Sequence, residues 1–419
     1  MSAPRGAQDP IVVVGAGHAG VQFANALRAA GSTRRIVLIS QESELPYEKP
    51  PLSKMFLDGT RDADGLRFHA AEHYETHDID LRLGVKVLEI DPVDDVLHLA
   101  DGTVQDFGTL VLATGGTPRR LPVRGAGFEG VVSLATRADA DRLRRLLARA
   151  RHPVLVGAGF IGLEVAAAAA ALRPVVVDVA ERVLARVSSA AVSGHVVAVH
   201  TASGVRFELN AAVSELRGTG GRVESVVLAD GRELPADLVV VGVGMVPNDR
   251  LAAGAGIAVA DGVLVDRQLA TSRARVYAIG DCARFETGAG ASLRLESVQN
   301  AADQARRLVR ILGGDRVGPD QVPWFWSHQG ALKLQIAGLP VPADRHVLRG
   351  APDVGRFSLF WYADGNLAYV ESVNHAAGHM LGRRLLAEGC SPPPELLADP
   401  GLDAKALLAR AAAAEATVS

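Results

Sequence analysis

The strongest constraint on the fold of this chain is a pair of glycine-rich hexapeptides, GAGHAG at residues 15–20 and GAGFIG at residues 157–162. Each follows a short aliphatic run that is typical of a buried strand, and each precedes a helical pattern. In such turns the first glycine makes a tight bend, the second lets the backbone approach a pyrophosphate, and the third lets the helix pack on the strand. The pyrophosphate then lies at the helix N-terminus, where free N–H groups favour negative charge. The pair predicts two dinucleotide sites.

The chain repeats more than these two turns. The segment LADGTVQDFGTLVLATG, residues 99–115, is echoed by LADGRELPADLVVVGVG, residues 228–244. Each has the pattern of an acidic hairpin turn followed by a buried strand that ends in glycine. Because the two segments follow the two glycine turns in the same order, we predict an internal duplication with two Rossmann-like α/β domains.

The composition fits a globular protein of two or three domains. The chain has 419 residues, of which 48% are hydrophobic and 22% charged, and its formal net charge is −3. This balance does not indicate a nucleic-acid partner. The sequence opens without a basic-then-apolar leader, and its apolar runs are shorter than a membrane span. We therefore expect a cytoplasmic protein that binds no nucleic acid and enters no membrane.

Cysteine is scarce in this chain. Only Cys282 and Cys390 are present, far apart and in no CxxC arrangement. A zinc site or an iron–sulfur cluster needs more ligands at closer spacing, so we expect no bound metal. Both residues are interpreted as reduced thiols.

The surroundings of the second glycine turn indicate NADH. Asp178 ends the next strand about 20 residues past Gly157, the interval at which a carboxylate accepts hydrogen bonds from the ribose of NAD. The same charge repels the extra phosphate of NADP. Glu164 follows Gly162 by two residues and is expected in the first turn of the helix, where the dipole favours its charge. The alternative for Glu164 is a helix-terminal acid without a further role.

Fewer residues of the first dinucleotide site can be identified from the sequence than of the second. Its second strand is followed by Glu42, the natural ribose ligand, although a solvated loop carboxylate fits the same pattern. The next loop contains Pro50 and Pro51, which predict a stiff extended segment before Ser53 caps a new helix. Such a loop would hold Lys54 in a fixed position.

Four longer motifs carry a family resemblance. They are PYEKPPLSK at residues 46–54, LVLATGGTPR at 110–119, VYAIGDCARF at 276–285 and PWFWSHQGALKLQIAGL at 323–339. Together they resemble the FAD-dependent NADH:ferredoxin reductases of bacterial oxygenase systems, and the resemblance runs along almost the whole chain. It implies a glutathione-reductase-like α/β fold with FAD in the first Rossmann-like domain, NADH in the second, and a C-terminal α+β domain. The implied boundaries are residues 1–115 and 246–322 for the FAD domain, 116–245 for the NAD domain and 323–419 for the C-terminal domain.

The resemblance also implies the residues that contact FAD. Lys54 would lie beside the isoalloxazine ring, Asp281 would accept a hydrogen bond from a ribityl hydroxyl, and Val298 would donate its amide to the ring. Two positions depart from the family pattern, since Gln41 stands where relatives often carry Asp and Ala135 where they carry Arg. The full set of FAD contacts is Gly15, Gly17, Ala19, Gly20, Gln41, Glu42, Lys54, Val87, Thr114, Gly115, Asp281, Val298 and Trp326.

The same resemblance implies the residues that act on NADH. Glu164 would face the nicotinamide and pair with Lys54, and Glu296 would lie near the same ring, so these three are the candidate catalytic residues. His328 stands where the family commonly carries Asp, close to the expected flavin environment. The full set of NADH contacts is Gly157, Gly159, Ile161, Gly162, Glu164, Asp178, Arg186 and Gly244.

The function implied by the resemblance is electron transfer. Hydride would pass from NADH to FAD, and the electrons would leave one at a time to a small [2Fe-2S] ferredoxin that feeds a cytochrome P450 or a Rieske-type oxygenase. The ferredoxin would dock near Arg306, Arg307 and Arg310, which by physical reasoning alone form a solvated helix face. The protein would be a monomer or a homodimer.

The scarcity of cysteine narrows the choice of electron acceptor. Flavoproteins that reduce disulfides or peroxides need a redox-active cysteine, and Ser53 stands near the position where single-cysteine relatives place theirs. Two alternatives stay open beside the ferredoxin reductase. One is a related rubredoxin reductase or NADH oxidase, and the other is a redox-sensing flavoprotein that resembles apoptosis-inducing factor.

Overall fold

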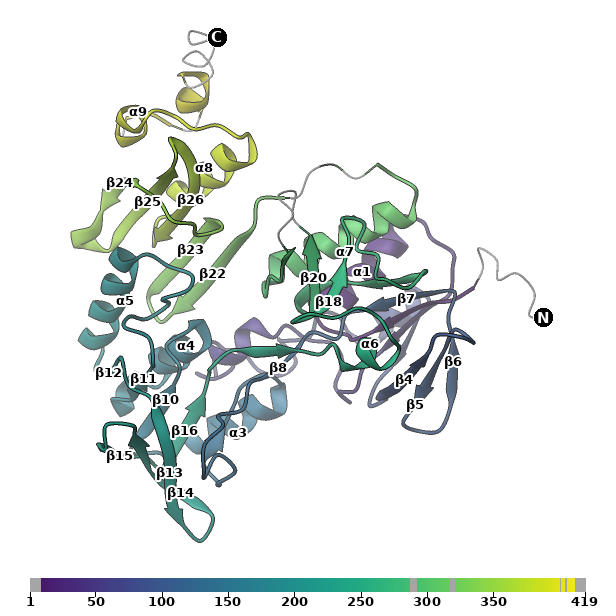
Figure 1. Ribbon diagram of the computed structural model, residues 1–419, viewed down its shortest axis with the longest axis horizontal. Helices are drawn as coiled ribbons and strands as arrows, with labels where there is room; N and C mark the ends of the chain where they lie inside the picture. The colour runs from purple at the N-terminus through teal and green to yellow at the C-terminus, as the bar shows by residue number, and fades with distance from the viewer. Residues whose placement is uncertain are drawn as a thin grey trace. The chain divides into compact units, whose positions relative to one another are not determined.

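The computed structural model describes residues 9–286, 292–316, 318, 321–399, 401–403 and 405–410 (Figure 1). The contacts within the chain divide it into two compact units. The first unit comprises Met1–Lys49, Arg61–Thr117 and Met245–Pro319, and the second unit comprises Pro50–Thr60, Pro118–Gly244 and Asp320–Ser419. Strands β8 (Gly116–Pro118) and β17 (Met245–Pro247) lie where the chain passes from one unit to the other.

The first unit is built on a parallel five-stranded sheet in the order β19-β7-β1-β2-β3. Helix α1 (His18–Ala29) follows β1 and packs against α7 (Val298–Leu312). The central strands consist of buried aliphatic residues on both faces, as expected for a parallel sheet covered by other elements. The strands are β1 (Ile11–Val14), β2 (Ile36–Ile39), β3 (Ile79–Arg82), β7 (Thr109–Leu112) and β19 (Val276–Ala278).

Smaller elements complete the first unit. An antiparallel meander in the order β4-β5-β6 precedes β7, and β18, β20 and β21 form another small sheet. The strands are β4 (Val87–Asp91), β5 (Val96–Leu99), β6 (Val104–Asp106), β18 (Val263–Val265), β20 (Ala283–Glu286) and β21 (Ser292–Leu293). The helices are α2 (Ala71–Thr76), α6 (Arg250–Gly254) and the 3₁₀ turn Gly280–Cys282.

The second unit repeats this plan between residues 118 and 244. Its parallel sheet has the order β12-β11-β10-β16-β9. The antiparallel meander β13-β14-β15 precedes β16, which pairs with β10, just as β4-β5-β6 precedes β7, which pairs with β1. The strands are β9 (Val131–Val132), β10 (Pro153–Val156), β11 (Val175–Val177), β12 (Arg206–Glu208), β13 (Val213–Thr219), β14 (Arg222–Leu228), β15 (Glu233–Pro235) and β16 (Leu238–Val241). The helices are α3 (Arg137–Leu147), α4 (Phe160–Ala168), α5 (Ala190–Ala202) and the 3₁₀ turns Pro50–Ser53 and Ala170–Leu172.

Four strands of each parallel sheet therefore correspond in order and pairing. Strand β10 corresponds to β1, β11 to β2, β12 to β3 and β16 to β7, since each set has the same order and parallel pairing. Both LADG sequences form the turn between the second and third strands of a meander. The predicted internal duplication and the two Rossmann-like domains are confirmed.

The C-terminal part of the second unit is an antiparallel five-stranded sheet in the order β22-β23-β26-β25-β24. Helix α8 (Ala376–Ala387) packs on β23 and β26, and residues 405–410 are also helical. This confirms the predicted α+β character of the segment. The remaining elements are β22 (Trp324–Gln329), β23 (Leu332–Gly338), β24 (Arg345–Ala351), β25 (Arg356–Ala363), β26 (Asn366–Val373), α9 (Pro394–Ala398) and the 3₁₀ turn Pro352–Val354.

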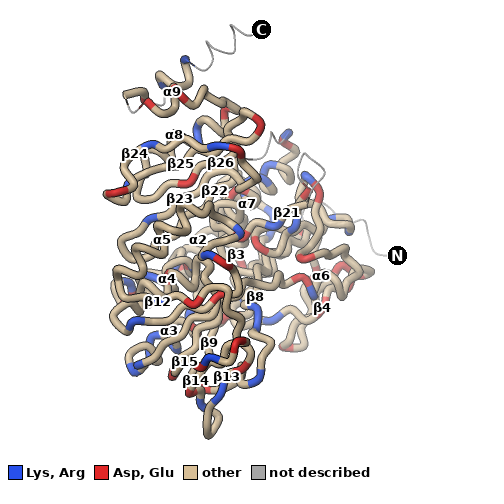
Figure 2. The backbone as a smooth tube through the Cα atoms, turned by 60° about the vertical axis from the view of Figure 1, so that its left-hand side comes forward, with Lys and Arg blue, Asp and Glu red and all other residues tan. Residues whose placement is uncertain are grey.

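The described surface carries charges of both signs. Figure 2 shows Lys and Arg interspersed with Asp and Glu along the chain. Every helix in the described ranges is too short or too polar to cross a lipid bilayer.

The glycines of the two hexapeptide turns have two different physical roles. In the second turn, a Cβ at Gly157 would lie 2.3 Å from the carbonyl oxygen of Gly242, and one at Gly162 would lie 2.0 Å from that of Gly157. Gly157 also has a φ of +111°, which disfavours other residues. A Cβ at the middle residue, Gly159, would meet no atom within 4 Å, and its φ of −80° suits any residue. The first and third glycines are therefore needed by the fold, and the second is not.

The first turn repeats this division. A Cβ at Gly15 would lie 2.1 Å from the carbonyl oxygen of Ala113, and one at Gly20 would lie 1.9 Å from that of Gly15. Gly17 has open space and a φ of −79°. Because folding alone does not require glycine at 17 or 159, both positions fit a requirement set by a ligand.

Substitution of these glycines tests the division directly. We expect Gly162→Ala to destabilise the protein by about 1–3 kcal/mol because its Cβ forces the backbone apart. Gly159→Ala should leave stability unchanged or slightly raised, since alanine fits the backbone there. Thermal unfolding of the nucleotide-free protein measures both effects. Equal losses of stability in the two variants would contradict this account.

Candidate functional site

The helices that follow the glycine turns begin without a capping side chain. The N-cap residues of α1 and α4 are Gly17 and Gly159, which offer no side-chain acceptor. Helices α3, α5 and α7 are capped by the side chains of Thr136, Ser189 and Ser297, whereas α2, α6, α8 and α9 also have no side-chain cap. The first N–H groups of α1 and α4 thus have neither a side-chain cap nor a Cβ in front of them, which suits a bound pyrophosphate.

In the first unit, three segments far apart in the sequence meet at the start of α1. Gly280 has a φ of +74°, and a Cβ there would lie 2.9 Å from the Cβ of Ala19. The Gly280 amide donates to Oε1 of Gln304 on α7 at 2.7 Å. These contacts bring Asp281 and α7, which begins at Val298, close to the first glycine turn. The predicted FAD residues of these segments thus share one region.

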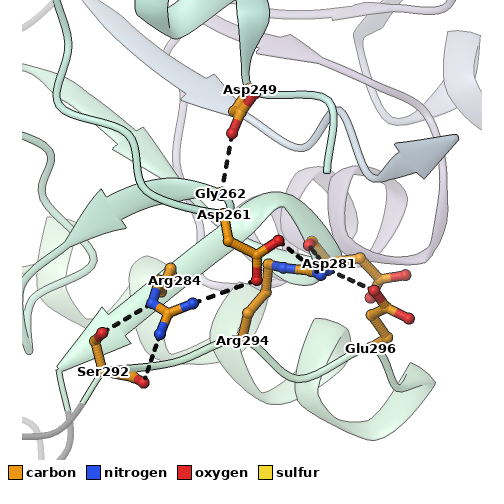
Figure 3. Close-up of polar contacts among 8 residues, drawn as sticks. All are labelled: Asp249, Asp261, Gly262, Asp281, Arg284, Ser292, Arg294 and Glu296. Carbon is orange, nitrogen blue, oxygen red and sulfur yellow. Dashed lines mark hydrogen bonds and ion pairs between the residues drawn. The ribbon is translucent and has the colours of Figure 1, made fainter. Parts of the chain in front are cut away.

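Asp281 carries an electrostatically perturbed carboxyl group. Burial raises its pKa from 3.8 to about 7, and the neighbouring Glu296 carboxylate acts in the same direction, against Arg294 and Lys49. Within the described part of the chain, the hydrogen bonds that reach Asp281 go to its backbone rather than its carboxylate (Figure 3). A partly buried acceptor of this kind fits the hydroxyl donors of a ribityl chain.

Glu296 is held by an arginine that sequence reasoning missed. The Arg294 guanidinium donates to Oε1 of Glu296 at 2.5 Å and to the backbone oxygen of Asp281 at 3.2 Å (Figure 3). It also lies 3.5 Å from Oδ1 of Asp261, which in turn pairs with Arg284. Arg294 thus ties the loop of Glu296 to the strand end that carries Asp281. The signal available in the sequence was an arginine two residues before Glu296.

The predicted adenosine contacts of the first unit lie around the end of β2. Glu42 accepts a hydrogen bond from the Tyr47 hydroxyl and lies 3.3 Å from the Lys49 ammonium, so it is a partnered carboxylate rather than a solvated one. Its neighbour Gln41 is exposed. Backbone hydrogen bonds join residues 40–42 to residues 84–85, directly before Val87 at the start of β4.

Thr114 and Gly115 follow strand β7. The Thr114 hydroxyl donates to the backbone oxygen of Asn248 at 2.7 Å, and the Asn248 side chain donates back to Thr114 at 2.8 Å. Gly115 has a φ of +62°. Asn248 therefore fixes this turn, a role that no local sequence pattern predicts.

In the second unit, Asp178 lies against the second glycine turn. Its carboxylate accepts from the amide of Ala158 at 2.6 Å and from the amide of Ala180 at 2.8 Å. Asp178 thus orders the turn itself, and each oxygen retains a lone pair for a ribose hydroxyl. Arg186 and Gly244 are also brought together, since the guanidinium lies 4.0 Å from where a Gly244 Cβ would be. Ile161 is 39% exposed in the first turn of α4.

The structure corrects the expected position of Glu164. Helix α4 begins at Phe160, so Glu164 lies beyond the first turn, and the dipole is not its main support. The side chain is buried, with 5% exposure, and its Oε2 lies 2.7 Å from the Lys54 ammonium. Oε2 also accepts from the Ser53 hydroxyl, and Oε1 accepts from the Ser327 hydroxyl at 2.7 Å. The predicted pairing of Lys54 with Glu164 is present in the geometry.

The proline-rich loop also differs from the expectation. Pro50–Ser53 is a 3₁₀ turn rather than an extended segment, because proline fits the first positions of a helical turn. Ser53 bonds to Glu164 instead of capping a helix. Lys54 also donates to the Pro50 carbonyl at 2.9 Å, so the turn and Glu164 together fix the ammonium.

The aromatic strand β22 presents its two faces to different partners. The Lys54 ammonium lies 5.2 Å from the centre of the Trp326 ring, and His328 lies next to Trp326 on the same face. Burial and the nearby Lys333 and Lys54 lower the pKa of His328. On the other face, Phe325 packs on Phe160 at the start of α4, with ring centroids 4.2 Å apart.

Three buried polar residues of the second unit were also missed. Ser327 contacts Glu164, Gln329 contacts Ser327, and Gln329 contacts His200 on α5. Ser327 and Gln329 alternate on the buried face of β22. Residues 327–329 are three consecutive polar residues, so the sequence does not show which of them face the interior, and nothing in the local sequence marks His200.

The arginines predicted to dock a ferredoxin all lie on α7. Arg306 pairs with Asp303, Arg307 donates to the backbone oxygen of Arg267 at 2.9 Å, and Arg310 donates to that of Arg316 at 3.2 Å. Arg306 and Arg310 are exposed. Their docking role stays a prediction.

Comparisons with known proteins agree with this geometry. Residues 9–305 match the pyridine nucleotide-disulphide oxidoreductase family, and residues 324–408 match the reductase C-terminal family. The chain is 42% identical to rhodocoxin reductase of Rhodococcus erythropolis over 403 residues, which cover 96% of this chain and 94% of the relative.

Two solved structures are also similar over nearly the full length. One is the ferredoxin reductase for the CYP199A2 system of Rhodopseudomonas palustris, with a TM-score of 0.92, 44% identity, and coverage of 95% of this chain and 99% of that one. The other is the covalent complex of putidaredoxin reductase with putidaredoxin, with a TM-score of 0.93, 36% identity, and coverage of 97% and 100%. With its two glycine-rich turns and its C-terminal sheet, this chain belongs to the pyridine nucleotide-disulphide oxidoreductases, flavoproteins that bind FAD and use NAD(P)H.

Proposed function

We propose that this protein takes hydride from NADH onto bound FAD and passes the electrons singly to a [2Fe-2S] ferredoxin that feeds a cytochrome P450 or Rieske-type oxygenase. The observation that carries the proposal is the pair of glycine-rich turns. In each turn the middle glycine has open space in front of it, and the helix that follows has no capping side chain. The second glycine turn is bonded to a carboxylate, Asp178, that suits a ribose and repels a phosphate, and no such bond reaches the first turn among the described residues. The names of the similar proteins support ferredoxin as the acceptor.

Each residue set would have a distinct task in this reaction. In the first unit, the turn at Gly15 and Gly17 would hold the FAD pyrophosphate and Asp281 would hold its ribityl chain. In the second unit, Gly159 and Asp178 would hold NADH. FAD, when bound, accepts a hydride and releases electrons one at a time. Lys54 and its neighbours would fix the polar surroundings of the reacting rings.

The cysteines of the chain do not fit disulfide chemistry. Cys282 is fully buried in the first unit, and burial raises the pKa of its thiol, which makes it a poor nucleophile. Cys390 belongs to the second unit. Ser53 is next to Lys54 and is bonded to Glu164, and a hydroxyl cannot form a mixed disulfide. A disulfide is therefore not the expected electron acceptor.

We also propose that the carrier binds at the basic face of α7. Exposed Arg306 and Arg310 present positive charge there, and acidic ferredoxins offer the complementary sign. Among the described residues, Arg306 pairs with the carboxylate of Asp303 and Arg310 with that of Asp315. Surface pairs of this kind are weak and exchange readily for a charged partner.

Stopped-flow spectroscopy tests the overall function. Mixing the FAD-loaded protein with NADH should bleach the flavin absorbance at least ten times faster than mixing with NADPH at equal concentration. The reduced protein should then reduce a [2Fe-2S] ferredoxin faster than a rubredoxin or oxygen. Equal rates with the two nucleotides would contradict the role of Asp178, and reduction of a dithiol acceptor in preference to every iron–sulfur carrier would contradict the proposed function.

The two nucleotide sites can be separated by matched substitutions. Gly159→Ala places a methyl group where the NADH pyrophosphate would lie, so we expect at least a tenfold loss of NAD⁺ affinity with FAD content unchanged. Gly17→Ala should have the opposite result, with FAD lost and unfolding stability of the FAD-free protein unchanged. Calorimetric titration with NAD⁺ and the flavin absorbance per protein measure these quantities. Loss of both nucleotides in either variant would contradict the assignment.

Asp281 predicts a specific pH dependence of stability in the FAD-free protein. Its pKa is raised from 3.8 to about 7 on folding, so between these values the folded state retains a proton that the unfolded state releases. Stability from this group therefore falls as the pH rises from about 4 to 7. Asp281→Asn should unfold at a similar temperature to the wild type at pH 4 and at a higher temperature at pH 7.5. A difference that stays constant with pH would contradict the raised pKa.

A further inference from the structure

A line of buried polar side chains ends on Glu164. Nε2 of His200 lies 2.9 Å from Oε1 of Gln329, Nε2 of Gln329 lies 3.2 Å from Oγ of Ser327, and Oγ of Ser327 lies 2.7 Å from Oε1 of Glu164. These four side chains come from α5, β22 and α4, and none is more than 5% exposed. Polar groups buried to this degree are normally present because each satisfies another.

The bonds in this line all have the same direction. The Gln329 carbonyl oxygen can only accept, so His200 must donate from Nε2. Burial lowers the pKa of His200, which favours the uncharged ring. The acceptor oxygen of Gln329 then selects the tautomer with its proton on Nε2. The amide N–H of Gln329 then donates to the Ser327 oxygen, which leaves the Ser327 hydroxyl proton free to point at the carboxylate. Every donor in the line is thus directed toward Glu164.

The two oxygens of Glu164 are supported by different parts of the chain. Oε2 receives the Lys54 ammonium and the Ser53 hydroxyl, both from the 50–60 segment. Within the described residues, the hydrogen bond to Oε1 comes from Ser327. A carboxylate fixed at both oxygens cannot rotate about its last side-chain bond. Ser327 therefore determines the orientation in which Glu164 meets Lys54.

We propose that Ser327 is a positioning residue for Glu164 and that Gln329 and His200 orient its hydroxyl, an inference that rests on the proposed function. Glu164 and Lys54 then keep one geometry as the nicotinamide is exchanged. Binding of NADH depends mainly on the second glycine turn and Asp178. Among the described residues, the side chains of His200, Gln329 and Ser327 form no hydrogen bond with either. Loss of the Ser327 hydroxyl should slow hydride transfer while leaving NADH affinity nearly intact.

The primary test is Ser327→Ala in the FAD-loaded protein. We expect flavin reduction at saturating NADH to slow about tenfold, with the dissociation constant for NADH changed less than twofold. The matched control is Ser358→Ala, which removes another fully buried hydroxyl of the same sheet, bonded to Ser372 and His375. That control should lose a similar amount of thermal stability and reduce its flavin at the wild-type rate. Equal rates in the two variants would overturn the proposal.

A double-substitution cycle asks whether Ser327 acts through Glu164. In a Glu164→Gln background, Ser327→Ala should cause less than a twofold further change in the rate of flavin reduction. The unfolding temperatures supply a readout that is independent of turnover, because the two losses of stability should also fail to add. Gln329→Leu leaves the serine in place but unoriented, so it should slow reduction by less than Ser327→Ala. Additive effects on both rate and unfolding temperature would show that Ser327 acts elsewhere and would overturn the proposal.

Failure of this inference can be distinguished from failure of the proposed function. If NADH does not reduce the wild-type flavin at all, the proposed function fails. The cycle in unfolding temperature still reports on the contact between Ser327 and Glu164 in that case, and additivity there would overturn the positioning role as well. If the wild type is reduced by NADH and Ser327→Ala is reduced equally fast, only the positioning role is wrong.

Discussion

The hydrogen bonds and the ion pair of the buried Glu164 carboxylate hold together three separate segments of the second unit. Removing a carboxylate from water costs several kcal/mol, and this cost is offset only where charge and hydrogen bonds are supplied together. Here the ammonium of Lys54 and the hydroxyls of Ser53 and Ser327 supply them. These donors come from the proline-rich turn and from β22, while Glu164 itself is on α4. One side chain therefore fixes three segments that are more than a hundred residues apart, and it does so where the chemistry is proposed.

A second buried carboxylate, on the C-terminal sheet, accepts hydrogen bonds from the loop before α5. Glu371 on β26 is fully buried and accepts hydrogen bonds from the Ser188 hydroxyl at 2.6 Å, the Ser189 amide at 2.8 Å and the Trp361 indole at 2.9 Å. Ser189 is the N-cap of α5, so the acid also lies near the positive end of that helix. Glu164 on α4 thus accepts a hydrogen bond from the C-terminal sheet, at Ser327. Glu371 on that sheet accepts one from the segment before α5, at Ser188. The C-terminal sheet is consequently an integral support of the loop that carries Arg186.

The sequence predicted those features that depend on local rules. The glycine turns, the paired LADG hairpins and Asp178 follow from backbone geometry and spacing within a single βαβ unit, and the structure has them in the expected order. The spacing of Glu164 from Gly162 predicts a position in the first helical turn, but the sequence does not show at which residue the helix begins. His200 could not be predicted, because its partner Gln329 is 129 positions away and a lone histidine on a helix has no local signature. Tertiary partners of buried polar groups are the part that single-sequence reasoning could not supply.

The three glycines of each turn show how fold and function can be separated at neighbouring positions. A side chain at the first or third glycine would overlap a backbone carbonyl, so those positions are fixed by packing whether or not a nucleotide is bound. The middle glycine has ordinary backbone angles and empty space in front of it, and its helix has no capping side chain. Alanine would be tolerated there by the fold and would lower the conformational entropy of the unfolded chain. The presence of glycine at both middle positions therefore favours a ligand that approaches the backbone closely at each site.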